Sequence, residues 1–397
     1  MKKLLLASVA TFAFGAAASA EDIKLGILIG FTGPIESLAP SMAAAAENAI
    51  AEVNASGLLL GGSTVTPVRG DTTCNIDTAV ATASAERMIT ADKVNAIIGG
   101  DCSGVTAAVL QNVARPNGIV MISPAATSPA LSTAEDDGLF FRTAPSDLAE
   151  GDVAADIMVA RGIKSAAITY VNSDYGKGLS EAIAAAFIAK GGTVTINAAH
   201  DDGKADYSAE VGALAAAGGD ILVVAGYLDG GGLGIIKAAL DTGAFDKFEL
   251  PGGMIGDSLA PAVGPGLNGS FGQVAGADTS SPGMVALAAI GTANGFDVNS
   301  PYTTESYDAA ALIMLAMQAA KSSKSTDFAG KVMDVANAPG EQIFPGELAK
   351  GLQLLADGVE IDYVGASGVE LVGGGESAGN YKEIEVIDGV QTTVGFR

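Results

Sequence analysis

Two loops carry the hydroxyl groups that are best placed for binding chemistry. Ser103 follows the apolar run 94–100, and Thr127 follows the apolar run 119–123. Each run is short and continuous, as is typical of a strand buried in a parallel sheet. Open α/β sheets bind ligands beyond the carboxyl ends of such strands. Because both loops offer hydroxyls and free backbone N–H groups beside a predicted helix start, they favour an anion. We therefore predict that Ser103 and Thr127 converge on the carboxylate of a small ligand.

Simpler roles compete with this prediction. Ser103 could serve only as the N-cap of the helix expected from Val105. Thr127 could serve only as a turn residue that stabilises its own backbone. The paired loops favour ligand contact over these local roles.

The elements that would position the two loops alternate between strand and helix. In the first half of the chain, strands are predicted at 23–31, 64–69, 94–100, 119–123 and 140–143, and helices at 39–53, 77–90 and 105–114. In a second series, helices are predicted at 148–161, 179–190, 207–217 and 234–240, and strands at 165–171, 193–199, 220–226 and 248–251. Such βαβ series predict parallel sheets wrapped by helices. Asp77 is the predicted N-cap of its helix.

Two similar series in tandem suggest an α/β protein with two lobes of one design. Helices predicted at 284–293, 304–320 and 327–335 would return to cover the first lobe, and a strand pair is predicted at 382–387 and 392–396. The chain would then cross between the lobes three times, and such crossings make a hinge. The predicted division is 1–20 as signal peptide, 21–143 plus 276–377 as lobe 1, and 144–275 plus 378–397 as lobe 2.

The N-terminal residues have the pattern of a secretory signal peptide. Lys2 and Lys3 precede the apolar run 4–14, and small residues end at Ala20. We expect cleavage before Glu21, with no lipid anchor because no cysteine follows at once. The alternative is an uncleaved membrane helix, but the run is shorter than the ~20 residues that a span needs. The mature chain is expected in the periplasm, without insertion in the membrane.

Charge and composition narrow the function classes. The chain has 21 Lys and Arg against 45 Asp and Glu, a net charge of −24. This balance argues against nucleic acid or anionic lipid as a partner. His200 is the one histidine, which we expect in a solvated loop, and no G-x-S-x-G elbow accompanies it. The triple glycines at 230–232 and 373–375 lack the Lys-Ser/Thr ending of a phosphate loop. We expect neither an enzyme nor a bound cofactor or metal.

The two cysteines, Cys74 and Cys102, suggest a disulfide because an exported chain with an even count usually pairs them. The bond would tie the loop after the second strand to the Ser103 loop. Unpaired buried thiols are the alternative, and a metal pair is a weaker one with a single histidine in the chain.

Several segments resemble a known family. They are 23–34, Cys74, the Cys102-Ser103 pair, 121–127, 174–179 and Gly226-Tyr227. Together they resemble the periplasmic branched-chain amino-acid-binding proteins, the leucine/isoleucine/valine-binding family of type I solute-binding proteins. The resemblance implies two Rossmann-like lobes that close around an amino acid and deliver it to an ABC permease. We also expect the protein to be a monomer.

The resemblance assigns roles residue by residue. It implies that Ser103 and Thr127 bind the ligand carboxylate and that the Ala125 carbonyl accepts from the α-ammonium. Tyr175 and Tyr227 would close over the ligand from the second lobe. Asp257 would be the acidic partner of the ammonium, with Glu36 as the second candidate. Two departures concern side-chain preference: the family commonly has Glu at the position of Asp257, and it often has an aromatic in the first loop.

Other functions remain open from the sequence. The same fold could bind an amide, a urea-like compound or an aromatic acid, a reading motivated by the missing first-loop aromatic. The protein could instead act as a receptor module that docks on a membrane sensor.

Overall fold

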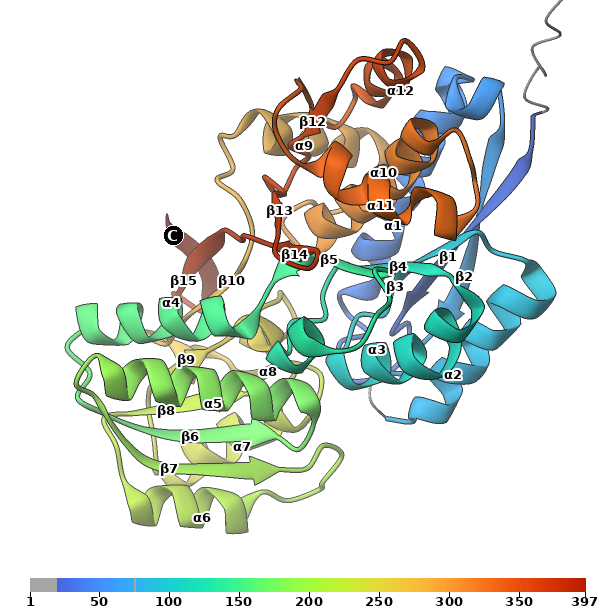
Figure 1. The fold of residues 1–397 in the computed structure, drawn as a ribbon. Coiled ribbons are helices and arrows are strands. Elements are labelled where there is room, and N and C mark those ends of the chain that lie inside the picture. The colour runs from blue at the N-terminus through green and yellow to red at the C-terminus, as the bar shows by residue number, and fades with distance from the viewer. Residues whose placement is uncertain (1–19, 75) are drawn as a thin grey trace, which may run out of the picture.

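A computed structural model describes residues 20–74 and 76–397 and shows two lobes, each built on a sheet (Figure 1). The predicted signal peptide falls almost wholly outside these residues. In the first sheet the strand order is β13-β14-β5-β4-β3-β1-β2, and in the second it is β16-β15-β10-β9-β8-β6-β7. This is the two-lobed α/β architecture that the sequence predicted.

The strands of the first sheet are β1 (Asp22–Ile29), β2 (Thr64–Asp71), β3 (Ala96–Gly99), β4 (Val120–Ser123), β5 (Phe140–Pro145), β13 (Leu371–Val372) and β14 (Glu376–Ser377). Those of the second are β6 (Ser165–Val171), β7 (Thr193–His200), β8 (Ile221–Ala225), β9 (Phe248–Leu250), β10 (Phe271–Ala275), β15 (Tyr381–Ile387) and β16 (Val390–Phe396). The pairs among β1–β5 and among β6–β10 are parallel, whereas β15 is antiparallel to β10 and to β16.

Helices cover both faces of each sheet. The first lobe holds α1 (Ala39–Ser56), α2 (Thr78–Arg87), α3 (Ser103–Val109), α9 (Pro282–Asn294), α10 (Thr303–Ala320), α11 (Ser325–Ala336) and α12 (Leu348–Ala356). The second holds α4 (Asp147–Ala160), α5 (Asp174–Ala189), α6 (Ser208–Ala217), α7 (Gly231–Thr242) and α8 (Leu259–Val263). Figure 1 shows α4 and α5 together on one side of the second sheet and α6 on the other.

Local signals explain several element boundaries. The Asp77 carboxylate accepts from the Ala79 N–H at 2.8 Å, so it is the N-cap of α2 as predicted. Helix α1 ends at Gly57, which takes the left-handed conformation with φ of 63°. Helix α10 is buried from Thr303 to Gln318 and packs on α1 and α11. It is thus a central helix of the first lobe. Among residues 20–74 and 76–397, no helix is long and apolar enough to cross a membrane.

Sheet membership changes three times along the chain: after β5, after β10, and between β14 and β15. The three segments form the crossings of the predicted hinge. The exact lobe boundaries stay predictions.

The segment 337–380 differs from expectation, because it adds α12, the hairpin β13–β14 and a small parallel sheet of β11 (Glu341–Ile343) and β12 (Ile361–Tyr363). These strands have two or three residues each, which is too short for an alternation of apolar and polar residues to show.

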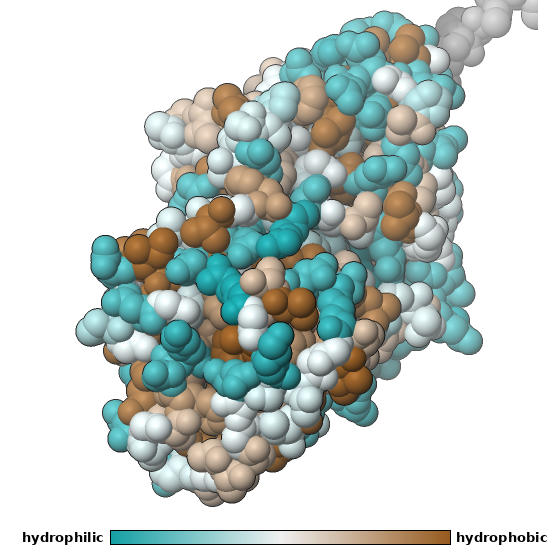
Figure 2. Space-filling model, turned by 90° about the vertical axis from the view of Figure 1, so that its left-hand side faces the viewer, coloured by the Kyte–Doolittle hydropathy of each residue, from teal (hydrophilic) through white to brown (hydrophobic). Residues whose placement is uncertain are grey.

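Hydrophilic and hydrophobic residues are interspersed on the face that carries β15, β16, α4 and α5 (Figure 2). Exposed apolar side chains on these elements include Leu148, Ile188 and Val390. Scattered apolar residues of this kind are normal on a protein surface.

Candidate functional site

Four of the six sequence-predicted ligand contacts line one cavity between the lobes. They are Ser103, Ala125, Tyr175 and Tyr227. The other lining residues are Ile35, Leu38, Asp101, Cys102, Gly253 and Tyr302. The cavity has a volume of about 20 Å³, which is room for about one water molecule. A larger ligand therefore enters only if the lobes separate.

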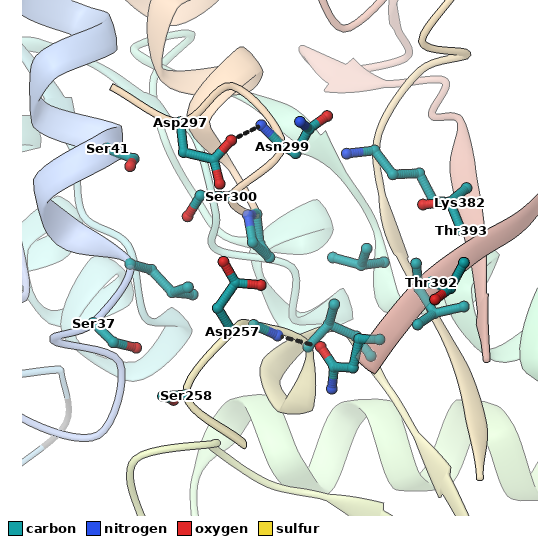
Figure 3. A pocket seen from close by; sticks show the side chains of 17 residues that line it. Ser37, Ser41, Asp257, Ser258, Asp297, Asn299, Ser300, Lys382, Thr392 and Thr393 are labelled. Carbon is teal, nitrogen blue, oxygen red and sulfur yellow. Dashed lines mark hydrogen bonds between the residues drawn. The ribbon is translucent and has the colours of Figure 1, made fainter. Parts of the chain in front are cut away.

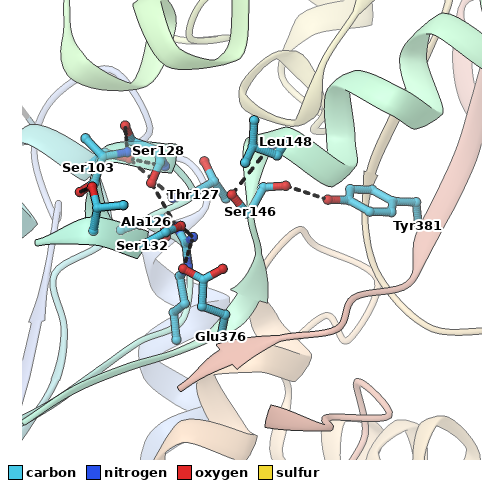
Figure 4. Close-up of polar contacts among 12 residues, drawn as sticks. Ser103, Ala126, Thr127, Ser128, Ser132, Ser146, Leu148, Glu376 and Tyr381 are labelled. Carbon is cyan, nitrogen blue, oxygen red and sulfur yellow. Dashed lines mark hydrogen bonds and ion pairs between the residues drawn. The ribbon is translucent and has the colours of Figure 1, made fainter. Parts of the chain in front are cut away.

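Ser103 links the two loops of the first lobe. Its Oγ accepts from the backbone N–H groups of Thr127 at 3.2 Å and Ser128 at 3.1 Å (Figure 4). Cys102, not Ser103, is the N-cap residue of α3, and it makes no side-chain cap. The simple capping role is therefore excluded. Because the oxygen of Ser103 serves as an acceptor, its proton is available for donation into the cavity.

Thr127 lies beside the cavity without lining it. Its N–H donates to Ser103, and its carbonyl accepts from the Asp147 N–H at 2.9 Å. Its hydroxyl lies on the side of Asp147, where it lowers the pKa of that carboxyl. Burial and the charge of Glu150 outweigh this effect and raise the pKa of Asp147 well above its usual range. The Thr127 backbone, rather than its hydroxyl, thus shapes the Ser103 loop.

Two tyrosines of the second lobe form the opposite wall. The rings of Tyr175 and Tyr227 are stacked, with centroids 5.0 Å apart. Tyr175 stands in the first turn of α5, and Tyr227 follows β8. The Tyr175 hydroxyl oxygen accepts from the Gly253 N–H at 3.0 Å. Burial raises the pKa of both phenols well above 10, so both are neutral.

Asp101 is a buried acid of the cavity that the sequence analysis did not single out. Its carboxylate accepts from the Gly30 N–H at 2.5 Å and from the Thr72 hydroxyl at 2.8 Å. Burial raises the pKa of Asp101, and these hydrogen bonds lower it. Its place directly before Cys102, at the carboxyl end of β3, was the available signal.

The predicted disulfide is present between Cys74 and Cys102, with 5.2 Å between the Cα atoms. It joins the loop after β2 to the residue before Ser103. The bond therefore fixes one end of the loop that presents the Ser103 hydroxyl.

Tyr302 also lines the cavity, and the sequence analysis did not predict it. It is the N-cap residue of α10 with φ of 62°, a left-handed conformation that is uncommon for a bulky residue. Such outliers cluster at functional sites. Nothing in the sequence Pro301-Tyr302-Thr303 indicates this conformation, so the contact was not predictable from a local pattern.

The two acids proposed for the ligand ammonium do not line this cavity. After β9, a turn at Gly252–Met254 brings Gly253 to the cavity wall, and Asp257 follows on the exposed side. Asp257 lines a second cavity with Lys382 and Asp297 (Figure 3). Glu36 is exposed, and its carboxylate accepts from the Gly33 N–H at 3.3 Å.

Buried acids lie behind the tyrosines. Glu150 accepts from the Gly252 N–H at 2.7 Å and from the Gln273 side-chain amide at 3.1 Å. Burial raises the pKa of Glu150 to about 7. Burial, together with the charge of Glu150, raises the pKa of Glu249 to about 8. These two buried carboxyl groups therefore hold protons near neutral pH.

The expectation of a solvated His200 was wrong. The ring is buried at the end of β7, with Nδ1 at 2.8 Å from the Thr169 hydroxyl and its edge toward Tyr207. Burial lowers the pKa of His200 to about 4. The reason is that β7 continues to His200 and Tyr207 folds back over it.

The Asp229 residue joins the two lobes through its carboxylate and its backbone. Asp229 of the second lobe accepts from the Ser37 hydroxyl at 2.5 Å and from the Ser37 N–H at 3.2 Å. Its own N–H donates to the Pro34 carbonyl at 3.2 Å. These contacts hold the lobes closed over the cavity.

Two lobes that close over a buried cavity and share three crossing segments define a hinged binding protein of the type I fold. The chain belongs to the periplasmic binding protein family, whose model matches residues 22–341. It is 32% identical over 334 residues to Leu/Ile/Val-binding protein homolog 1 of Brucella melitensis, over 82% of this chain and 86% of the relative. The Leu/Ile/Val-binding protein of Escherichia coli K12 is 30% identical over 268 residues, which are 67% of this chain and 71% of the relative.

Solved structures share the fold at lower identity. The branched-chain amino acid binding protein LivJ of Streptococcus pneumoniae, in complex with isoleucine, matches with a TM-score of 0.77 and 19% identity, over 95% of this chain and 99% of that one. A solute-binding protein of Rhodopseudomonas palustris, in complex with p-hydroxybenzoic acid, matches with a TM-score of 0.77 and 19% identity. The match covers 95% of this chain and 97% of that one. The fold thus serves both amino acids and aromatic acids.

Proposed function

We propose that this chain is the exported substrate-binding protein of an ABC importer, that it acts without catalysis, and that it closes on a small apolar amino acid for delivery to the permease. The observation that carries the proposal is the position of the Ser103 hydroxyl. It faces Tyr175 and Tyr227 across the cavity between the lobes. Its oxygen is held by two backbone amides, which leaves its proton for a ligand carboxylate.

The remaining lining supports an amino acid with an aliphatic side chain. Ile35 and Leu38 give an apolar wall. A buried ammonium needs an acidic or carbonyl partner. The Ala125 carbonyl and the Asp101 carboxylate are the groups of the cavity that supply it, in place of Asp257 or Glu36.

Titration calorimetry on the mature, ligand-stripped chain tests the proposal with leucine, isoleucine and valine. We expect binding, and we expect Ser103→Ala to weaken it by about 10- to 100-fold, because a hydrogen bond to a charged group contributes roughly 1.5–3 kcal/mol. The matched control is Ser280→Ala, at an exposed serine outside the cavity, which should leave affinity unchanged. Absence of binding to all three amino acids would contradict the proposal.

An aromatic acid is the second candidate. The cavity is lined by three tyrosines, Tyr175, Tyr227 and Tyr302, whose rings could pack on an aromatic ligand. Benzoate in the same titration separates the two candidates. Binding of benzoate with no response to leucine would favour the aromatic acid.

A further inference from the structure

A second, larger cavity lies at the junction of the lobes and has a volume of about 490 Å³ (Figure 3). The start of α1 and the loop 297–301 line it from the first lobe. The loop 255–258 and strands β10, β15 and β16 line it from the second. Leu38 lines both cavities, so they share a wall. The volume is in the range of pockets that hold small molecules.

Lys382 is the basic residue of this cavity, and it is 6% exposed. It stands on β15 beside the second hinge crossing. Its aliphatic stem packs against Gly276, where a Cβ would have no room and where φ is 153°. Figure 3 shows the ammonium group pointing into the cavity. The stem is therefore buried at the hinge while the charge faces the open space.

The Lys382 ammonium has no ion-pair partner among residues 20–74 and 76–397. The acids next to it along β15 are engaged elsewhere: Glu383 pairs with Arg161 and Arg397, and Glu385 pairs with Arg161. Burial lowers the pKa of Lys382, and the charges of Glu305 and Asp297 raise it. Placing a cation in a largely buried position without a partner is costly, and a bound anion would offset that cost.

The rest of the lining is suited to a polar molecule. It includes the hydroxyls of Ser41, Ser300, Thr392 and Thr393 and the carboxylates of Asp257 and Asp297. Asp297 accepts from the Asn299 N–H at 2.9 Å. The Gln391 side chain accepts from the Gly256 N–H at 2.8 Å and donates to the Met254 carbonyl at 3.3 Å, which fixes one wall.

We propose that this second cavity binds a small hydroxylated carboxylate, with the carboxylate on the Lys382 ammonium and a hydroxyl donated to Asp257 or Asp297. One buried cation facing hydroxyls and rim acids matches a molecule that is anionic at one end and a hydrogen-bond donor at the other. Because both lobes line the cavity, the molecule would contact both sides of the hinge. The site does not include Ser103, so it stands apart from the proposed amino-acid site.

The probe is 3-hydroxybutyrate, which has one carboxylate and one hydroxyl, and butyrate, which lacks the hydroxyl, is its comparator. Calorimetry on the mature chain should show 3-hydroxybutyrate binding more tightly than butyrate. Lys382→Met should weaken 3-hydroxybutyrate binding at least tenfold, whereas the control Lys247→Met, at an exposed lysine outside the cavity, should not change it. Ser103→Ala should also leave 3-hydroxybutyrate binding intact. Failure of 3-hydroxybutyrate to bind the wild type, unchanged affinity in Lys382→Met, or loss in Ser103→Ala would each overturn the proposal.

A measurement on the wild-type chain guards against a variant that fails to fold. Acetic anhydride labels accessible lysines, and peptide mass spectrometry reports the extent at each one. Saturating 3-hydroxybutyrate should reduce acetylation at Lys382 severalfold and leave Lys247 unchanged. Equal labelling of Lys382 with and without 3-hydroxybutyrate would contradict the proposal.

Discussion

Glu249 and Glu150 show how strongly burial can alter a single side chain. Glu249 has no measurable exposure and Glu150 is 2% exposed. The pKa of Glu249 is raised to about 8 and that of Glu150 to about 7, by burial first. In the unfolded chain a glutamate loses its proton near pH 4.3. Folding at neutral pH therefore takes up protons at these two carboxyl groups.

The consequence is a defined pH dependence of stability. Between about pH 4 and pH 8 these two carboxyl groups bind more protons in the folded state than in the unfolded state, so the stability that they contribute falls as pH rises through this window. Glu249→Gln is neutral at every pH and should remove part of that fall. We expect it to raise Tm by about 4 °C or more at pH 8 and to change it little at pH 4.

Thermal unfolding followed by circular dichroism at the two pH values measures the difference. Glu86→Gln, at an exposed glutamate on α2, is the control and should give no such pH-dependent gain. Equal Tm changes at both pH values in Glu249→Gln would show that Glu249 is ionised in the folded protein.

At the residue scale, the sequence predicted positions at strand ends better than side-chain directions. Ser103 follows an apolar run directly, so its place beyond β3 could be inferred. Asp257 is separated from β9 by a turn whose geometry the sequence does not specify, and it lies in a different cavity. Tyr302 reaches the site only through a left-handed conformation. His200 is buried by Tyr207, a contact that depends on the tertiary fold.

At the scale of elements, the periodic segments were predictable and the short ones were not. The predicted helix at 148–161 corresponds to α4 (Asp147–Ala160), and the strand pair near the C-terminus corresponds to β15 and β16. β13 and β14 have two residues each and join the first sheet only through pairing with β5. Pairing with a strand more than 230 residues away leaves no local pattern.

The disulfide between the loops after β2 and β3 leads to a prediction at the scale of elements. The disulfide closes a loop of 28 residues, and on the chain-entropy model this stabilises the folded state by roughly 3–4 kcal/mol. The double variant Cys74→Ser/Cys102→Ser should lose about that free energy of unfolding in a urea titration. It should also bind leucine more weakly, because Cys102 precedes Ser103.

Reductant provides the matched control. Dithiothreitol should shift the unfolding midpoint of the wild type toward that of the double variant and leave the double variant unchanged. A wild-type midpoint equal to that of the double variant without reductant would contradict the expected stabilisation.

At the scale of the whole molecule, Asp229 is a contact that joins the two lobes in the closed arrangement. Its carboxylate binds Ser37 of the first lobe and the Ser258 hydroxyl of its own lobe, the latter at 2.9 Å. A contact made only when the lobes are closed favours the closed state and slows ligand release. Such a contact has little effect on the rate at which the open form first associates with the ligand.

Asp229→Ala should therefore raise the dissociation rate of leucine severalfold and leave the association rate nearly unchanged. Stopped-flow measurement of tyrosine fluorescence gives both rates. Asp241→Ala, at an exposed aspartate on α7, is the control. A slower association with an unchanged dissociation rate would place the role of Asp229 in ligand entry instead.

The order in which strands enter the sheets has a consequence for synthesis. β14 adds to the first sheet and β15 to the second, and both come from beyond residue 375. A nascent chain emerges from the ribosome N-terminal end first, so neither lobe can gain its last strands until that late segment has been made. A polypeptide still tethered to the ribosome is thus held short of its finished tertiary structure. Such incompleteness would suit a chain that must be threaded through a translocation channel before it matures.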